Sequence, residues 1–323
     1  MNFKQSRNGV LALAALASTV SAFAFAACSS DDTSTPAPKD AAVDTTTPVP
    51  DGGGSDADAG PAPRTVYAVD DANQLLKFTS TAPASVSKST ISGAPGVLGI
   101  DFRPATGDLY ALGNNGTIYT LDKNTGVATA VVGDAGTPTF PVTLDPAATS
   151  FGFDFNPAAD RIRVHANTGQ NLRLHPANGQ AVNATGDGTL TYEDGGTVKI
   201  VGSAYTNSVN PKPTATALYG IESDSNQLLA FANLDGGVVG GFARARSVGG
   251  LGVDVDTVGG FDIYGGQGGG DGGPTVNLPI EAYAALRVGT ATNLYRVDLQ
   301  SGTATAIGAI GHDRPLRGIA VQP

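Results

Sequence analysis

The stretch that decides the fold runs from Gly99 to Val131 and reads GIDFRPATGDLYALGNNGTIYTLDKNTGVATAV. It contains four short runs of β-branched, aromatic and aliphatic residues. Between the runs stand Gly, Asn, Asp and Pro, the residues that tight turns require. No helical period is sustained in it. The stretch therefore predicts four short strands joined by turns.

The same pattern recurs along the chain. Further copies open at Gly152-Phe153-Asp154, Gly202-Ser203-Ala204 and Gly260-Phe261-Asp262. Each copy continues through two apolar runs to a turn of the Asn-Gly, Asp-Gly or Ser-Gly type, which suits a hairpin. Internal repetition of this kind indicates one supersecondary unit copied several times.

Half a copy remains at each end of the repeat region. Residues 318–321 match only the opening strand, and residues 66–91 match only the later three strands. Together they complete one unit, so we expect the last strand to pair with the first and close a ring. The predicted fold is an all-β propeller, in which closure protects strand edges.

The spacing of the copies sets the number of blades. The equivalent positions recur every 50 to 58 residues, and five units of that size fill the region. We therefore predict five four-stranded blades; six blades is the alternative if residues 182–201 form extra strands, and a β-sandwich is a further alternative. The equivalent positions are Asp101, Asp154, Ala204, Asp262 and Ala320.

The N-terminus carries the features of an export signal. Lys4 and Arg7 precede an apolar stretch, residues 10–26, that is at the short end of what spans a bilayer. Small residues before Cys28, the only cysteine, resemble the bacterial lipobox, which implies lipidation of that thiol. We expect an exported protein, lipid-anchored to a bacterial membrane with its folded domain extracytoplasmic, divided into a signal peptide (1–27), Cys28 and a disordered tether (28–64), and the propeller (65–323).

Composition bears on the partners. The tether is built of Asp, Thr, Pro, Gly, Ala and Ser, which cannot offset the entropy of ordering. The whole chain has a net charge of −10, and no basic stripe interrupts it. Nucleic acid is therefore not an expected partner, because nothing offsets the repulsion of phosphates. The expected contacts are the membrane, through the lipid on Cys28, and an envelope protein or glycan.

Several motifs together resemble a known family. They are Gly99–Pro104 with Gly107–Leu112, Asp160–Val164 leading to Asn171-Leu172-Arg173, and Ala282–Leu286. In this order they are similar to the bacterial domain of unknown function 4394 over about residues 65–323. The resemblance implies a propeller in an exported protein and supplies no activity.

Asp101, Asp154 and Asp262 form the first candidate site. Inner strands of a propeller border the axis, so three carboxylates could ring one end of the channel. They could act as the acid and base of a glycosidase or as oxygen ligands of Ca²⁺. The alternative is that each Asp binds backbone N–H groups or an Arg between blades, and no resident cofactor is expected.

The second candidate site is basic. Arg161, Arg163 and His165 alternate along one strand, and Arg173 and His175 alternate along the next. Side by side they could bind a carboxylate, a phosphate or an acidic glycan. Equally, the arginines could pair with Asp101 or Asp154 across the blade interface.

Recognisable catalytic motifs are scarce. The Gly-rich segment 265–273 lacks the Lys-Ser/Thr of a phosphate loop and is predicted to be a surface loop. No metal-binding His spacing or Gly-x-Ser-x-Gly elbow occurs in the sequence. The leading hypothesis is a non-catalytic binding module for an envelope protein, peptide or glycan. A hydrolase of a glycan or lactone, using the three Asp, and a structural envelope component are the alternatives.

Overall fold

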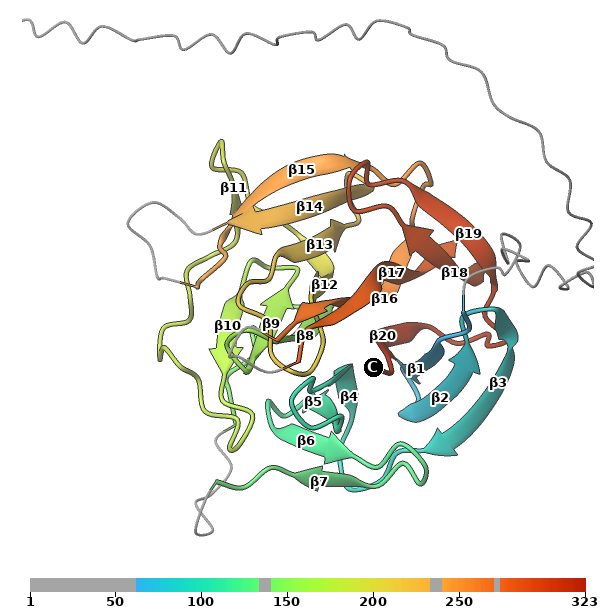
Figure 1. Ribbon diagram of the computed structural model, residues 1–323, viewed down its shortest axis with the longest axis horizontal. Helices are drawn as coiled ribbons and strands as arrows, with labels where there is room; N and C mark the ends of the chain where they lie inside the picture. Colours follow the sequence, from blue (N-terminus) through green and yellow to red (C-terminus); the bar gives the residue numbers. More distant parts are fainter. Residues whose placement is uncertain (1–61, 134–140, 233–239, 270–273) are drawn as a thin grey trace, which may run out of the picture. The chain divides into compact units, whose positions relative to one another are not determined.

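The computed structural model describes residues 62–133, 141–232, 240–269 and 274–323, in which all regular structure is β-strand. The strands form five small sheets arranged as a five-bladed β-propeller (Figure 1). In the described ranges no helix is long and apolar enough to cross a bilayer. Cys28 and nearly all of the predicted tether lie outside these ranges.

Blade 1 closes the ring as the repeats predicted. Its strand order is β20-β1-β2-β3, and the C-terminal strand pairs antiparallel with the first, with Val66 opposite Val321 and Ala68 opposite Ile319. The two ends of the domain are therefore joined by a full strand pair. The strands are β1 (Thr65–Asp70), β2 (Gln74–Thr79), β3 (Ala82–Thr90) and β20 (Leu316–Val321).

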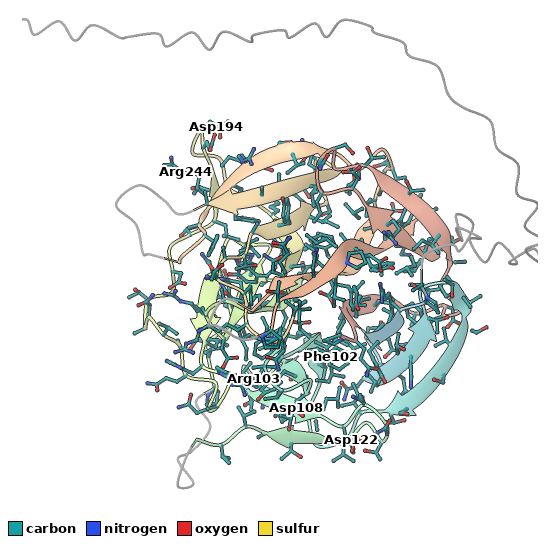
Figure 2. All side chains as sticks on the ribbon, in the orientation of Figure 1. Phe102, Arg103, Asp108, Asp122, Asp194 and Arg244 are labelled. Atoms are coloured by element: carbon teal, nitrogen blue, oxygen red, sulfur yellow. The ribbon has the colours of Figure 1, made fainter. Side chains whose placement is uncertain are left out.

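Blade 2 is the regular copy, with the order β4-β5-β6-β7. Gly107 and Gly126 adopt positive φ angles in its turns, as those hairpins require. In Figure 2, Phe102 on the inner strand lies toward the middle of the ring and Asp122 lies at the rim. The strands are β4 (Val97–Phe102), β5 (Leu109–Gly113), β6 (Ile118–Leu121) and β7 (Ala128–Ala130).

Blades 3 and 4 depart from the repeat. Blade 3 has three strands in its described part, with the order β10-β9-β8, and blade 4 has five, because β11 pairs in parallel with β15. Residues 182–201 contribute only the short β11 and the first two residues of β12, so they do not build a sixth blade. The strands are β8 (Phe151–Asn156), β9 (Arg161–Ala166), β10 (Asn171–Leu174), β11 (Thr191–Tyr192), β12 (Ile200–Tyr205), β13 (Leu218–Glu222), β14 (Gln227–Ala232) and β15 (Arg244–Gly250).

Blade 5 carries a long hairpin. Its strands are β16 (Thr257–Gly268), β17 (Val276–Val288), β18 (Ala291–Val297) and β19 (Ala304–Ala309), in that order. The prediction of a surface loop at the Gly-rich segment is wrong for residues 265–268, which continue β16. In Figure 1 the arrows of β16 and β17 cross the middle of the ring. The hairpin is fixed to blade 4 by a bridge between Ser208 and Gly265 and by a bond from Gln267 N to Asn207 Oδ1.

The core lies between neighbouring blades, and the inner strands approach very closely. A Cβ atom at Gly152 would lie 2.3 Å from Ser203 Oγ, and one at Gly260 would lie 2.3 Å from Ile319 N. Only glycine leaves room for this approach. The glycines that open these two copies of the repeat therefore set the packing of the inner strands around the axis.

Candidate functional site

Three carboxylates meet at the axis. Asp101, Asp154 and Asp262 lie at equivalent positions on β4, β8 and β16, and all three side chains are buried. Carboxylate oxygen atoms of the three lie within 4.8 Å of one another, a spacing that could hold a metal ion. The structure thus brings together the three Asp residues that the sequence singled out.

Backbone N–H groups donate hydrogen bonds to these carboxylates. Each Asp accepts a hydrogen bond from the inner strand of the following blade, and Asp101 and Asp262 also accept one from the residue after them. Together these bonds use five of the six carboxylate oxygen atoms. The donor N–H groups are those of Phe102 and Phe155 for Asp101, Tyr205 for Asp154, and Ile263 and Val321 for Asp262.

The two blades without an Asp explain this pattern. Ala204 and Ala320 cannot accept a bond from the following strand, so the N–H groups of Ile263 and Phe102 are bound by the Asp of their own strand. Three carboxylates therefore satisfy all five equivalent N–H groups around the ring. This arrangement joins the blades to one another, and it agrees with the backbone alternative raised from the sequence.

The same environment disfavours the ionised form. Burial raises the pKa of Asp262 to about 6. Burial, together with repulsion by a neighbouring carboxylate, raises the pKa values of Asp101 and Asp154 well above the usual range. Bonds from backbone N–H groups oppose these shifts in part. The ring of carboxylates therefore retains protons at pH values where exposed Asp is ionised.

The axis has no room for a substrate. The cavity that the five inner strands line has a volume of about 10 Å³, which suits roughly one water molecule. It is lined at the level of the repeat glycines, among them Gly99, Gly152 and Gly260. A glycan or lactone does not fit, so we do not carry the hydrolase hypothesis forward for these carboxylates.

Arg163 lies in a buried ion network. Its side chain is 1% exposed, and its Nη1 donates to Asp187 Oδ2 (2.9 Å) and to Asn171 Oδ1 (2.6 Å). Its Nε donates to Tyr205 Oη (3.1 Å) and its Nη2 to the carbonyl oxygen of Gly240 (2.6 Å). All three guanidinium nitrogens are engaged. Arg163 therefore holds blades 3 and 4 together rather than presenting a charge to a ligand.

The other predicted basic residues divide into two groups. Arg173 also contacts Asp187, with 3.1 Å between Nε and Oδ2, so the carboxylate partner of these arginines is Asp187 rather than Asp101 or Asp154. His165 is buried against the Phe231 ring, and burial and the Arg163 charge lower its pKa well below the usual value. Arg161 and His175 are half-buried. Burial, then the charges of Arg161 and Arg173, lowers the pKa of His175, so those three side chains lie near one another.

Superposing the repeats explains the position of Arg163. The residue paired with each axial position is a tyrosine in four blades and an arginine in blade 3. Tyr110 packs edge-on against Phe155 of the next blade, with ring centroids 5.1 Å apart. In blade 3 the same two positions are in contact, but Arg163 replaces the first aromatic residue and donates from Nε to the Tyr205 hydroxyl. The five residues are Tyr67, Tyr110, Arg163, Tyr219 and Tyr283.

A groove between blades 4 and 5 has room for a ligand. Its volume is about 870 Å³, within the range of small-molecule and peptide sites. It opens on the ring face where β12 ends and β13 begins. Tyr219 and the 49%-exposed Ile280 give it apolar surface, and Asp298 also lines it. Arg296 lies at its edge, but it is paired with Tyr283 and its guanidinium contacts Glu281 and Tyr283 on the opposite face of the sheet, toward blade 1. The sequence analysis did not single out Tyr219, Ile280 or Arg296.

Arg296 differs from Arg163 in its exposure. Its side chain is 37% exposed, and its Nη1 lies 3.4 Å from Glu281 Oε1. Glu281 also accepts a stronger bond from Arg64 Nε, at 2.7 Å. Burial raises the pKa of Glu281, but the bonds from Arg64 and Tyr283 outweigh it and leave the pKa below the usual value. Two guanidinium groups therefore share one ionised carboxylate.

An equivalent but smaller groove exists in blade 2. Its volume is about 470 Å³, and Thr120 and Asp122 line it at the positions that Arg296 and Asp298 take in blade 5. Asp122 lies at the rim in Figure 2. This copy of the groove has neither an arginine nor a tyrosine in its lining. The blade 4 and 5 copy is larger, and its wall also includes Thr206 and Tyr219 of blade 4 and Ile280 of the long hairpin.

A further groove, of about 590 Å³, lies on blade 3. It is lined by Gln170, Asn171, Gln180 and small residues, with no charged side chain in its lining. The amide of Gln170 is already bonded to Thr143 O and Asp145 N, and Asn171 is bonded to Arg163. Its polar side chains are thus largely occupied by the fold.

These features define a five-bladed propeller that has a closed, carboxylate-bonded axis and a chemically distinct groove between two of its blades. The family model for the domain of unknown function DUF4394 matches residues 74–320. The chain belongs to this family, as the motifs in its sequence indicated.

Solved structures resemble the fold at low identity. A chain of a nidogen/laminin complex matches 81% of this chain and 99% of its own length, at 10% identity and a TM-score of 0.46. An auxiliary nutrient binding protein from Bacteroides ovatus matches 75% of this chain but 54% of its own length, at 12% identity and a TM-score of 0.45. A protein of unknown function from Bacteroides caccae matches 81% of this chain and 99% of its own, at 10% identity and a TM-score of 0.38. No curated protein matched. These likenesses carry no information about a ligand.

Proposed function

We propose that this chain is a non-catalytic binding module and that its ligand occupies the groove between blades 4 and 5. The supporting observation is that this groove combines ligand-sized volume with a half-buried Tyr219 and an exposed Ile280. The three axial carboxylates and the guanidinium of Arg163 are instead hydrogen-bonded within the fold. The ligands that fit are peptides, protein segments or glycans of the cell envelope.

A thermal-shift screen of the full chain tests this function. The panel contains peptides, oligosaccharides and organic anions, and each hit is repeated with the Ile280→Ser variant. A ligand at about 100 times its Kd adds roughly 2.7 kcal/mol to the wild type. We expect Ile280→Ser to lose much of that stabilisation and Arg287→Gln, at the other end of β17, to retain it. Equal stabilisation of all three proteins would place the site elsewhere.

We further propose that the module is exported and held on a bacterial membrane by lipid on Cys28. The motive is the sequence alone: a charged start, an apolar run and small residues before a single cysteine. Two or three acyl chains suffice for stable anchoring. Cell fractionation tests the anchor, with wild type expected in the membrane fraction and Cys28→Ala released from it. Recovery of both proteins in the same fraction would contradict the anchor.

A further inference from the structure

Blade 3 carries a row of basic side chains on the face that it turns toward blade 4. β10 pairs with β9 so that Arg173 stands opposite Arg163. Two residues further along, the same register places His175 opposite Arg161. Arg163 fixes the direction of this face, because its Nε donates to the hydroxyl of Tyr205 in blade 4. Directly opposed residues have Cβ atoms about 4.5–5.5 Å apart, so Arg161 and His175 are neighbours at the end of the row.

The repeat does not require basic residues at this end of the row. In blade 2 the equivalent positions hold two carboxylates, and in blade 4 they hold two alanines. These residues are Asp108 and Asp122, and Ala217 and Ala232. Blades of this fold therefore form with acidic or neutral side chains at this place, and packing alone does not account for Arg161 and His175.

The carboxylates closest to the row in the chain and in space are engaged elsewhere. Asp160, which precedes Arg161, is bound by Arg103 of blade 2 at 2.8 Å and 2.5 Å. Asp187 is bound by Arg163 at 2.9 Å. Within the part of the chain that the structure describes, no carboxylate forms an ion pair with Arg161. The charge of Arg161 is therefore not neutralised by an ion pair there.

Arg161 presents the side of its guanidinium that suits an oxyanion. Its Nη1 donates to the carbonyl oxygens of Ala159 (3.3 Å) and Asp160 (2.8 Å). Nε and Nη2 donate to none of the described residues, and together they form the parallel N–H pair that binds oxyanions in a bidentate manner. The half-buried ring of His175 likewise has no hydrogen bond in the described ranges. Burial, then the charges of Arg161 and Arg173, lowers its pKa, as expected of an imidazole that faces cations.

We propose that Arg161 and His175 bind a phosphate group, with the charge of Arg173 beside them. The fork of Arg161 binds two phosphate oxygens, and a ring N–H of His175 donates to a third. A carboxylate has two oxygens, which one bidentate arginine engages, whereas a phosphate group presents at least three and carries more negative charge. None of these residues lines the groove between blades 4 and 5, so the inference goes beyond the proposed function and does not depend on it.

The test titrates the full chain with inorganic phosphate or glycerol phosphate at constant ionic strength and follows the phosphorus-31 NMR signal. We expect saturable broadening with the wild type and binding about tenfold weaker with Arg161→Gln, because a charged bidentate contact is lost. His175→Gln should weaken binding several-fold. Arg287→Gln is the matched control, because Arg287 is also half-buried and bonded to a backbone carbonyl, that of Gly289. This control should bind as the wild type does.

Two further measurements make the result specific. Arg161→Lys keeps the charge but loses the fork, so its affinity should fall between those of the wild type and Arg161→Gln. Acetate, added as a competitor, should displace phosphate only in large excess. Tighter binding of glycerol phosphate than of inorganic phosphate would assign the ligand to a phosphate ester, and the reverse would assign it to the free ion.

Three results would overturn the phosphate site. They are the absence of saturable binding, equal affinity of Arg161→Gln and the wild type, and displacement by acetate at a concentration equal to that of phosphate. Circular dichroism of each variant without ligand confirms that a loss of binding is not a loss of fold. Ile280→Ser should leave phosphate binding unchanged, so failure of this site and failure of the groove are separate outcomes.

Discussion

The interfaces between blades 3 and 4 and between blades 4 and 5 are built from the same repeat, yet they differ at two positions. In the first, Asp154 binds Tyr205 N and Arg163 binds Tyr205 Oη, so Tyr205 is held at both ends. In the second, Ala204 stands in place of Asp154 and Tyr219 in place of Arg163. Ala204 has no side-chain acceptor for the backbone N–H of the next blade. The first interface is closed, and the second borders the largest groove described above.

The two arginines show the same contrast. Arg163 is 1% exposed and uses all three guanidinium nitrogens within the fold, whereas Arg296 is 37% exposed and its Nη1 makes two long contacts, 3.4 Å to Glu281 Oε1 and 3.4 Å to Tyr283 Oη. Both stand beside a carboxylate and a tyrosine, so residue type does not distinguish them. Burial and the number of occupied donors separate an arginine fixed in the scaffold from one at the surface.

The largest expected effect is the loss of unfolding free energy when the interface between blades 3 and 4 is disrupted. Arg163→Met leaves Asp187 buried with the weaker contact to Arg173, and the loss of one partner from a buried ion pair costs about 3–5 kcal/mol. Urea unfolding of the full chain measures it. Arg296→Met serves as the matched control, because exposed ion pairs contribute about 1 kcal/mol or less. Similar losses in the two variants would contradict the contrast between the arginines.

The next largest expected effect is a difference in the stability lost when two of the axial carboxylates, Asp262 and Asp154, are each replaced by Asn. Asp262→Asn should destabilise by about 1–3 kcal/mol, because both oxygens of Asp262 accept N–H bonds and an amide NH₂ would face one of those donors. Asp154→Asn can keep its bond to Tyr205 N and should cost less than half as much. Chemical denaturation at pH 7 compares them. Equal losses would show that the number of N–H bonds a carboxylate accepts does not determine how much it contributes to stability.

The pH dependence of the Asp154→Asn variant sharpens the same point. Burial, then the charges of Asp101 and Asp262, raises the pKa of Asp154. The folded state therefore holds a proton that the unfolded chain has released. Its stabilising contribution is present below the unfolded pKa near 4 and is lost as pH rises through the raised folded pKa, by about 1.4 kcal/mol per pKa unit.

Asn carries no such proton, so the variant should gain stability relative to the wild type between pH 4 and pH 8. Unfolding free energies measured at several pH values across that range give the difference directly. A difference that stays flat, or falls with pH, would mean that the axial carboxylates are not held in their protonated form.

The smallest expected effect is on the stability of the free protein when Arg296 is replaced. Arg296→Gln should change the unfolding free energy by less than about 1 kcal/mol, because the side chain is 37% exposed and Glu281 keeps its bond to Arg64. The melting temperature of the free protein measures this. A large loss would show that Arg296 is fixed in the scaffold, as Arg163 is.

Much of the fold was predictable from the repeat. Copies that begin with Gly and end at a turn predict the blades, and the half-copies at the two ends predict the closure by β20. The irregular parts were not predictable, since the segment around Asp187 has no counterpart in the repeat. The extension of β16 was mistaken for a loop because Gly265–Gly268 lack the β-branched and aromatic residues typical of strands.

The site was less accessible to sequence reasoning. The repeat placed Asp101, Asp154 and Asp262 together, but only the structure shows that their oxygens bind backbone N–H groups. Alignment of the copies could have placed Arg163 in the core, since tyrosine stands at that position in the other four. No local pattern could have joined Tyr219 and Ile280, which come from β13 of blade 4 and β17 of blade 5.

Hydrogen exchange of the full chain, with and without the strongest ligand from the screen, tests the central claim most directly. Exchange slows where a ligand covers amides or completes their hydrogen bonds. The account predicts protection in residues 276–282 and 296–303, at the groove between blades 4 and 5, and no change around Arg163. Protection confined to the blade 3 groove, at residues 169–189, would contradict it.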